Sequence, residues 1–138
     1  MMSRLLGLTL CVLALAGCNG SGQGKLPLAG SVELDGLPLA TGDILFTSVS
    51  GAVATASIVD GKFAIPADRS VPAGTYGVQI TGYEKTGKMI PDSDAPGQMV
   101  EETKSIVPAK YNMASELTQD ITADNASSLE FRLSSDGE

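Results

Sequence analysis

The chain contains few residues that could carry out covalent chemistry. It has no histidine and no tryptophan, and its two cysteines are Cys11 and Cys18. Without histidine the usual zinc sites and the Ser-His-Asp and Cys-His relays are excluded, and without an indole there is no strong platform for stacking on a sugar. We therefore expect a non-catalytic protein with no cofactor and no metal. The thiol of Cys18 is then the main candidate for covalent modification.

Carboxylates are the second group of side chains that could bind a ligand or react. Asp92 and Asp94, followed by Glu101 and Glu102, carry oxygen ligands of the kind that Ca²⁺ prefers. Their spacing fits no calcium-binding loop, and the same acids also keep a surface loop soluble. We expect a solvated loop at this position and not a metal site.

The segment from 84 to 104 shows no clean hydrophobic period. Loops of this length in a compact domain are usually functional or disordered. Its apolar residues either fold back on a sheet or form an adaptable partner surface. The candidate partner-binding residues of this loop are Met89, Ile90, Asp92, Asp94 and Met99.

An uncharged apolar run from Leu5 to Ala16 lies near the N-terminus. At about a dozen residues it would reach roughly 18 Å as a helix, whereas a bilayer core needs ~20 residues and ~30 Å. Arg4 precedes the run and small residues follow it, which is the layout of a secretory signal. The Gly-rich stretch from 19 to 24 that comes next is typical of a flexible tether.

The end of the apolar run resembles the lipobox of bacterial lipoproteins. The matching residues are Leu15-Ala16-Gly17-Cys18. The resemblance implies cleavage between Gly17 and Cys18, a diacylglyceryl thioether on Cys18 and acylation of the new amine. Several acyl chains, at ~0.8 kcal/mol per buried CH₂, would anchor the protein firmly to a membrane. Asn19 is not the Asp that signals inner-membrane retention in lipoproteins, which by analogy favours the outer membrane, on its periplasmic or surface face.

Three segments follow from this interpretation: a lipoprotein signal peptide at 1–17, a lipidated Cys and flexible tether at 18–25, and one domain at 26–138. Cys11 would be discarded and Cys18 capped, so no disulfide is expected. The formal net charge is −7, and the acids are spread along the chain without blocks. This pattern argues against binding to nucleic acid.

The domain is predicted to be all-β. Period-two alternation and turn residues indicate about seven short strands and no helix of normal length. Asp35-Gly36 and Asp60-Gly61 are hairpin signals, the second between two alternating runs. The expected strands cover residues 28–34, 42–49, 53–59, 62–65, 74–81, 117–123 and 129–133.

Four successive motifs resemble carboxypeptidase regulatory-like domains. They begin at Gly30-Ser-Val-Glu-Leu, Ile44-Leu-Phe, Ala56-Ser-Ile-Val-Asp-Gly-Lys-Phe and Pro72-Ala-Gly-Thr-Tyr-Gly-Val. Ile106-Val-Pro-Ala-Lys-Tyr-Asn and the closing Leu129-Glu-Phe-Arg-Leu are similar to the endings of short bacterial lipoproteins built on that domain. The resemblance implies an antiparallel Greek-key β-sandwich, Ig-like or prealbumin-like, without catalytic residues.

Two tyrosines have a structural interpretation. Tyr76, which follows Pro72-Ala-Gly74, is expected to form a tyrosine corner, with its hydroxyl bonded to nearby backbone. Tyr111 is expected to cap an edge of the core. Related sandwiches form Lys-to-Asn isopeptide bonds, for which Lys25 or Lys62 with Asn112 would be needed. Neither lysine lies at a clearly buried strand position, so this bond is not expected.

The sequence thus predicts a membrane-anchored lipoprotein that serves as a binding or structural module of the cell envelope. Its partners would be the membrane, through the lipid, and an envelope protein or a polysaccharide. The alternative is a carbohydrate-binding module at the cell surface. That alternative is weakened because Tyr76, Tyr83 and Tyr111 are the only tyrosines and there is no tryptophan.

Overall fold

The computed structural model describes residues 24–136. The predicted signal peptide, with Gly17, and the predicted lipidation site Cys18 lie outside these residues. The described part is built of strands and two short 3₁₀ helices, η1 (Ala67–Arg69) and η2 (Ala109–Tyr111). The strands are β1 (Leu28–Leu34), β2 (Leu37–Pro38), β3 (Thr41–Thr47), β4 (Val53–Val59), β5 (Lys62–Ile65), β6 (Gly74–Pro91), β7 (Met99–Ser105), β8 (Thr118–Ile121) and β9 (Leu129–Leu133).

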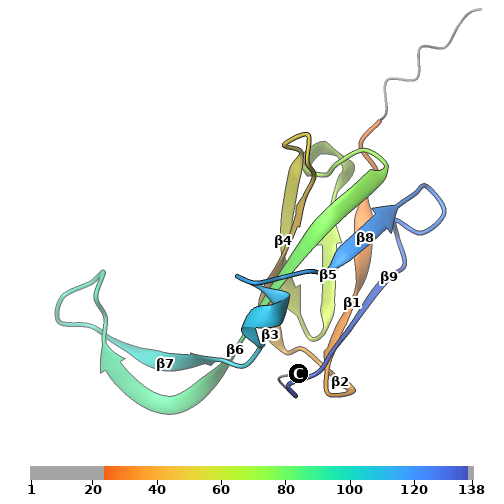
Figure 1. The fold of residues 1–138 in the computed structure, drawn as a ribbon. Helices are drawn as coiled ribbons and strands as arrows, with labels where there is room; N and C mark the ends of the chain where they lie inside the picture. The colour runs from red at the N-terminus through yellow and green to blue at the C-terminus, as the bar shows by residue number, and fades with distance from the viewer. Residues whose placement is uncertain (1–23, 137–138) are drawn as a thin grey trace, which may run out of the picture.

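The strands form one curled sheet, a half-barrel (Figure 1). Along the sheet the order is β2-β1-β5-β4-β3-β6-β7, with β8 added to β6 and β9 added to β1. The prediction of an all-β domain of mainly antiparallel strands is confirmed. One pairing differs from it, because β9 runs parallel to β1, with Gly30 opposite Leu129 and Leu34 opposite Leu133. Alternation along a strand reports which face is buried and not which neighbour it will pair with, so the sequence did not indicate this parallel pair.

Both Asp-Gly turns form as predicted. Asp35 and Gly36 have φ of 53° and 79°, and Asp60 and Gly61 have φ of 51° and 76°. Two consecutive positive φ values define the turn whose twist matches that of the flanking strands, and Asp-Gly is one of the pairs that tolerates it. These turns connect β1 to β2 and β4 to β5.

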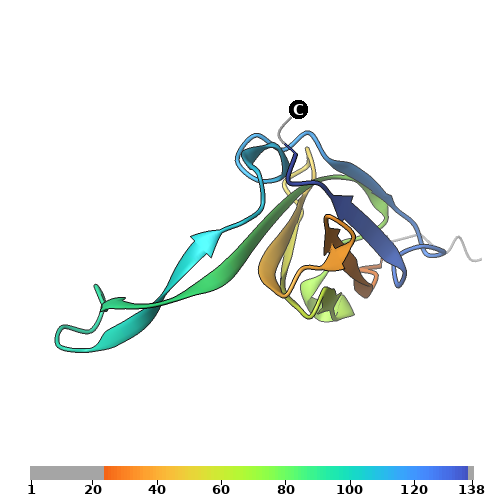
Figure 2. The same ribbon diagram turned by 90° about the horizontal axis from the view of Figure 1, so that it is seen from below.

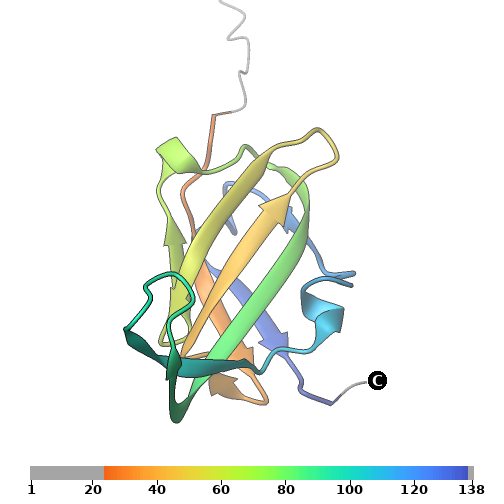
Figure 3. The ribbon, with the colours of Figure 1, turned by 90° about the vertical axis from the view of Figure 1, so that its left-hand side faces the viewer.

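The buried side chains of the described residues form one hydrophobic core. Figure 3 shows the curl of the strands that supply them. Each alternating run supplies buried side chains at every second position, for example Tyr76, Val78 and Ile80 of β6. All three phenylalanines of the chain meet there: the ring centroids of Phe46, Phe63 and Phe131 lie 5.9 to 6.2 Å apart. These tilted contacts join β3, β5 and β9, no two of which are adjacent in the sheet, and so help to hold its curl.

Glycines allow two strand pairs to approach closely. A Cβ on Gly30 of β1 would lie 2.2 Å from the carbonyl oxygen of Leu129 in β9, and a Cβ on Gly42 of β3 would lie 2.0 Å from that of Thr81 in β6. Backbone atoms cannot move aside as a flexible side chain can. The parallel pair β1–β9 therefore depends on the missing side chain at position 30.

We predict that Gly30→Ala lowers the free energy of unfolding by about 1–3 kcal/mol, because the added methyl group forces β1 and β9 apart. Urea denaturation followed by circular dichroism measures this loss. Gly77→Ala is the matched control, since a Cβ on Gly77 of β6 would meet Thr47 at an ordinary 3.6 Å. Equal losses for the two variants would contradict the proposed clash.

The predicted tyrosine corner is confirmed. The buried Tyr76 donates a hydrogen bond from its hydroxyl to the carbonyl oxygen of Pro72, at 2.8 Å. Burial raises the pKa of Tyr76 above its ordinary value of 10.0. Tyr111 also behaves as predicted: it packs against the core, and its hydroxyl accepts a bond from the backbone N–H of Ser134, at 3.1 Å.

We predict that Tyr76→Phe costs about 1 kcal/mol at neutral pH through the lost hydrogen bond. Because the pKa of Tyr76 is raised by folding, the neutral form is favoured in the folded state, and stability should fall as the pH rises above about 10. Replacing the phenol by a phenyl ring should therefore reduce this fall in the free energy of unfolding at alkaline pH. Denaturation midpoints between pH 7 and 11 measure both effects, with Tyr83→Phe as the exposed control; an unchanged alkaline slope in Tyr76→Phe would refute the assignment.

Candidate functional site: the β6–β7 arm and the cleft at its base

Strand β6 extends well beyond the half-barrel. Its first part pairs with β8 and with β3, from Gly74 to Gly82, and the remainder pairs with β7 alone. The resulting two-stranded ribbon projects away from the body (Figures 1 and 2). We call residues 83–105 the arm. Within the described part of the chain, no side chain of the arm belongs to the buried core.

The expectation of a long loop from 84 to 104 is wrong. The segment is a β-hairpin whose strands pair from Tyr83–Ser105 to Pro91–Met99. Two features hide it in the sequence. Both faces of the ribbon contact solvent, so no apolar alternation is required, and a bulge between Lys85 and Met89 interrupts the period.

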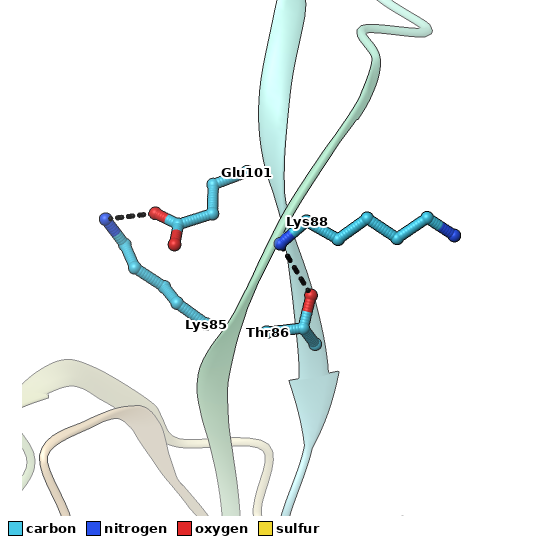
Figure 4. Close-up of polar contacts among 4 residues, drawn as sticks. All are labelled: Lys85, Thr86, Lys88 and Glu101. Carbon is cyan, nitrogen blue, oxygen red and sulfur yellow. Dashed lines mark hydrogen bonds and ion pairs between the residues drawn. The ribbon is translucent and has the colours of Figure 1, made fainter.

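The bulge is held by polar contacts (Figure 4). Between the pairs Lys85–Thr103 and Met89–Glu101, β6 has three residues, Thr86 to Lys88, and β7 has one, Glu102. Gly87 takes a φ of 79°. The Thr86 hydroxyl donates to Glu102 at 2.9 Å. It also accepts from the backbone N–H of Lys88 at 3.3 Å, as Figure 4 shows. Next to it, Lys85 and Glu101 form an ion pair at 3.0 Å. Exposed pairs of this kind contribute at most about 1 kcal/mol each, so the arm is weakly stabilised by itself.

The predicted partner-binding residues all lie on the arm, but on different surfaces. Met89 pairs with Glu101 and Met99 with Pro91, so both methionines lie on one face of the ribbon, and Ile90 lies on the other with Val100. Met89 and Met99 are each 53% exposed. The apolar residues therefore do not fold back on the sheet, and they remain available to a partner.

Asp92 and Asp94 shape the turn at the tip of the arm. The Asp92 carboxylate accepts the backbone N–H of Asp94 at 2.8 Å, and the backbone N–H of Asp92 donates to the carbonyl of Gln98 at 2.9 Å. Among residues 24–136, no group of three or more acidic or cysteine side chains lies close enough together to hold a metal ion. These hydrogen bonds give the two acids a role in the turn.

A cleft of about 800 Å³ lies at the base of the arm. Its walls are the β1–β2 hairpin on one side and the first residues of the arm on the other, with Ile106 following β7. The sequence did not indicate it, because it forms where two separate hairpins meet; the only signal was an apolar Leu37 at a turn, which is 70% exposed. The residues that line the cleft include Leu37, Pro38, Tyr83, Lys85, Lys104 and Ile106.

The chemistry of the cleft is that of a binding surface. Apolar side chains line it, and Lys85 and Lys104 contribute charge together with Asp35 and Glu84. The pKa of Asp35 is lowered by hydrogen bonds from Ser135, whose backbone N–H donates to the carboxylate at 2.8 Å. That contact fixes the chain after β9 against the edge of the cleft.

The tyrosines offer little support for sugar stacking. Tyr76 is buried in the core, and Tyr111 is partly buried with Lys110 5.1 Å above its ring. Tyr83, at 37% exposure, is the one described tyrosine whose ring lines a cleft. The carbohydrate-binding alternative stays a prediction.

The groups considered for an isopeptide bond lie in unsuitable surroundings. Lys25 and Lys62 are exposed, and Lys25 donates to the backbone carbonyl of Asp68 at 3.3 Å. The side-chain amide of Asn112 donates to the carbonyls of Val107 and Pro108, within its own turn.

Comparisons with protein-family models, with curated proteins and with solved structures find no match to this chain. The candidate site is therefore defined by its geometry alone. In the part of the chain from 24 to 136, no helix is long and apolar enough to cross a bilayer.

We predict that the arm can be removed without unfolding the body. Glu84 and Lys104 form a hydrogen-bonded pair across the ribbon, so replacing residues 85–103 by Asn-Gly closes a two-residue hairpin between them. Because the deleted side chains are outside the buried core, the free energy of unfolding should change by less than about 1 kcal/mol. Chemical denaturation measures this; a loss of cooperative unfolding would show that the arm is an essential part of the fold.

Proposed function

We propose that this protein is a lipid-anchored, non-catalytic binding or structural module of a bacterial cell envelope. The observation that carries the proposal is the arm, a ribbon with exposed apolar side chains that contributes nothing to the core. A two-stranded ribbon without a core is marginally stable by itself, so such an extension is best explained by a role in contact with a partner. The adjacent cleft enlarges the available surface.

The two ends of the body support a tethered arrangement. The chain enters the body where Leu26 bridges Val71, at one end of the half-barrel, and the arm leaves from the other end (Figures 1 and 3). An anchor at Cys18 would hold the first end near the membrane. The arm would then extend away from the lipid, toward components of the envelope.

The finer assignment is to a short lipoprotein with a carboxypeptidase regulatory-like, transthyretin-like domain, an antiparallel Greek-key sandwich of about seven strands. The order of the quoted motifs along β1, β3, β4 and β6 supports it, as does the tyrosine corner at Tyr76. The parallel pairing of β9 with β1 is a feature that this assignment has to accommodate. Asn19 follows Cys18 in place of the Asp that signals inner-membrane retention in lipoproteins. By analogy, the proposed location is the outer membrane.

We predict that the full chain, expressed in a Gram-negative bacterium, incorporates radiolabelled palmitate and fractionates with the membrane. Cys18→Ser should abolish the labelling and release the protein, because the acceptor sulfur is lost. Cys11→Ser is the matched control, since the other cysteine lies within the apolar run and should leave labelling unchanged. Labelling that persists in Cys18→Ser, or that is absent from the unmodified chain, would contradict the anchor.

A further inference from the structure

The outer edge of β7 is an open strand edge. β7 pairs with β6 on one side and, among residues 24–136, with no strand on the other. Two hydrogen bonds define which backbone groups face outward: Ile106 donates to Gly82 at 3.0 Å, and Asp92 donates to Gln98 at 2.9 Å. Because hydrogen-bonded and open pairs alternate along an antiparallel ladder, four residues of β7 turn their N–H and C=O groups away from β6. They are Met99, Glu101, Thr103 and Ser105.

We propose that this edge pairs with the same edge of a second copy of the chain, antiparallel, with Thr103 on the two-fold axis. The proposal names the partner of the arm and rests on the arm being a contact surface. It does not depend on the lipid anchor.

Charge favours one register, because it alone forms complementary pairs. Two identical antiparallel strands must place the residue on the axis opposite its own copy, and like charges directly opposite each other are destabilising. An axis at Glu101, Glu102 or Lys104 would place a charged side chain directly opposite the same side chain of the second copy. An axis at Thr103 instead places Glu102 opposite the partner's Lys104, and Lys104 opposite the partner's Glu102. The register centred on Thr103 thus forms two complementary pairs and no like-charge pair.

Side-chain chemistry along this register is favourable at the other positions too. The two Thr103 side chains face each other, a cross-strand pair that is stabilising in antiparallel sheets. Glu101 lies opposite the partner's Ser105. Beyond the charged pairs, Val100, which is 39% exposed, comes opposite the partner's Ile106. Glu102 already accepts a bond from Thr86, and a carboxylate has lone pairs left for a lysine as well.

Pairing with a second copy would also supply the additional strands that the arm lacks. The ribbon has two strands and no core, whereas three or more strands are needed for independent stability. Joining two arms gives a four-stranded sheet in which the outward N–H and C=O groups of both β7 strands are hydrogen-bonded. The open edge, otherwise prone to unspecific pairing, is then covered.

A cysteine at the axis tests the register directly. In full-length Thr103→Cys, the two thiols belong to a hydrogen-bonded pair with Cα atoms about 5.5 Å apart, which suits a disulfide. Mild oxidation of total lysates of expressing cells should therefore convert more than half of the protein into a disulfide-linked dimer on non-reducing gels. Ser105→Cys is the matched control, because it lies opposite Glu101 of the second copy and its own copy is four residues further along that strand, too far to be bridged. The unmodified chain controls for Cys11 and Cys18.

Charge reversal provides the second measurement. Glu102→Lys and Lys104→Glu should each weaken dimer formation at least tenfold in sedimentation of the purified full chain, and the double variant should restore it. A monomeric unmodified chain, equal cross-linking by the two cysteine variants, or a double variant that stays monomeric would each overturn the proposal. Loss of palmitate labelling would leave these outcomes unaffected, so failure of the anchor and failure of the dimer are distinguishable.

Discussion

The uninterrupted backbone of β6 is the constraint on which the rest of the structure depends. One strand of 18 residues pairs successively with β8, β3 and β7, so the half-barrel and the arm share a single element. Tyr76, Val78 and Ile80 anchor its first half in the core. Because the second half continues directly from the first, the position of the core determines where the arm leaves the body.

The body achieves its curl through a few specific contacts. The three phenylalanine rings join strands that are not adjacent in the sheet, and Gly30 and Gly42 let neighbouring backbones approach closely. The segment around η2 contributes Val107 and Tyr111 and is tied to the end of β9 through Ser134. The cleft at the base of the arm is a by-product of the same arrangement, since it forms where the β1–β2 hairpin meets the departing ribbon.

The candidate site was only partly visible in the sequence. Apolar side chains in a polar segment indicate a contact surface. Of Met89, Ile90 and Met99, the two methionines are exposed on the arm and Ile90 is partly buried. Their division between two faces was not predictable, because it follows from cross-strand pairing and from the extra residues at Thr86–Lys88. The acids Asp92 and Asp94 suggested a ligand set, yet their local hydrogen bonding shows a role in the turn.

The amino-acid sequence by itself determined the features that depend on neighbouring residues. These are the all-β class, the two Asp-Gly turns, the buried alternation and the tyrosine corner, each of which follows from backbone conformation or from period-two burial over a few positions. Only the tertiary structure decided the parallel pairing of β9 with β1, the ordered arm in place of a loop, and the cleft. These features arise between segments that are distant in the chain. A strand can form the same backbone hydrogen bonds with many other strands, and the close packing of backbone and side chains selects one of them.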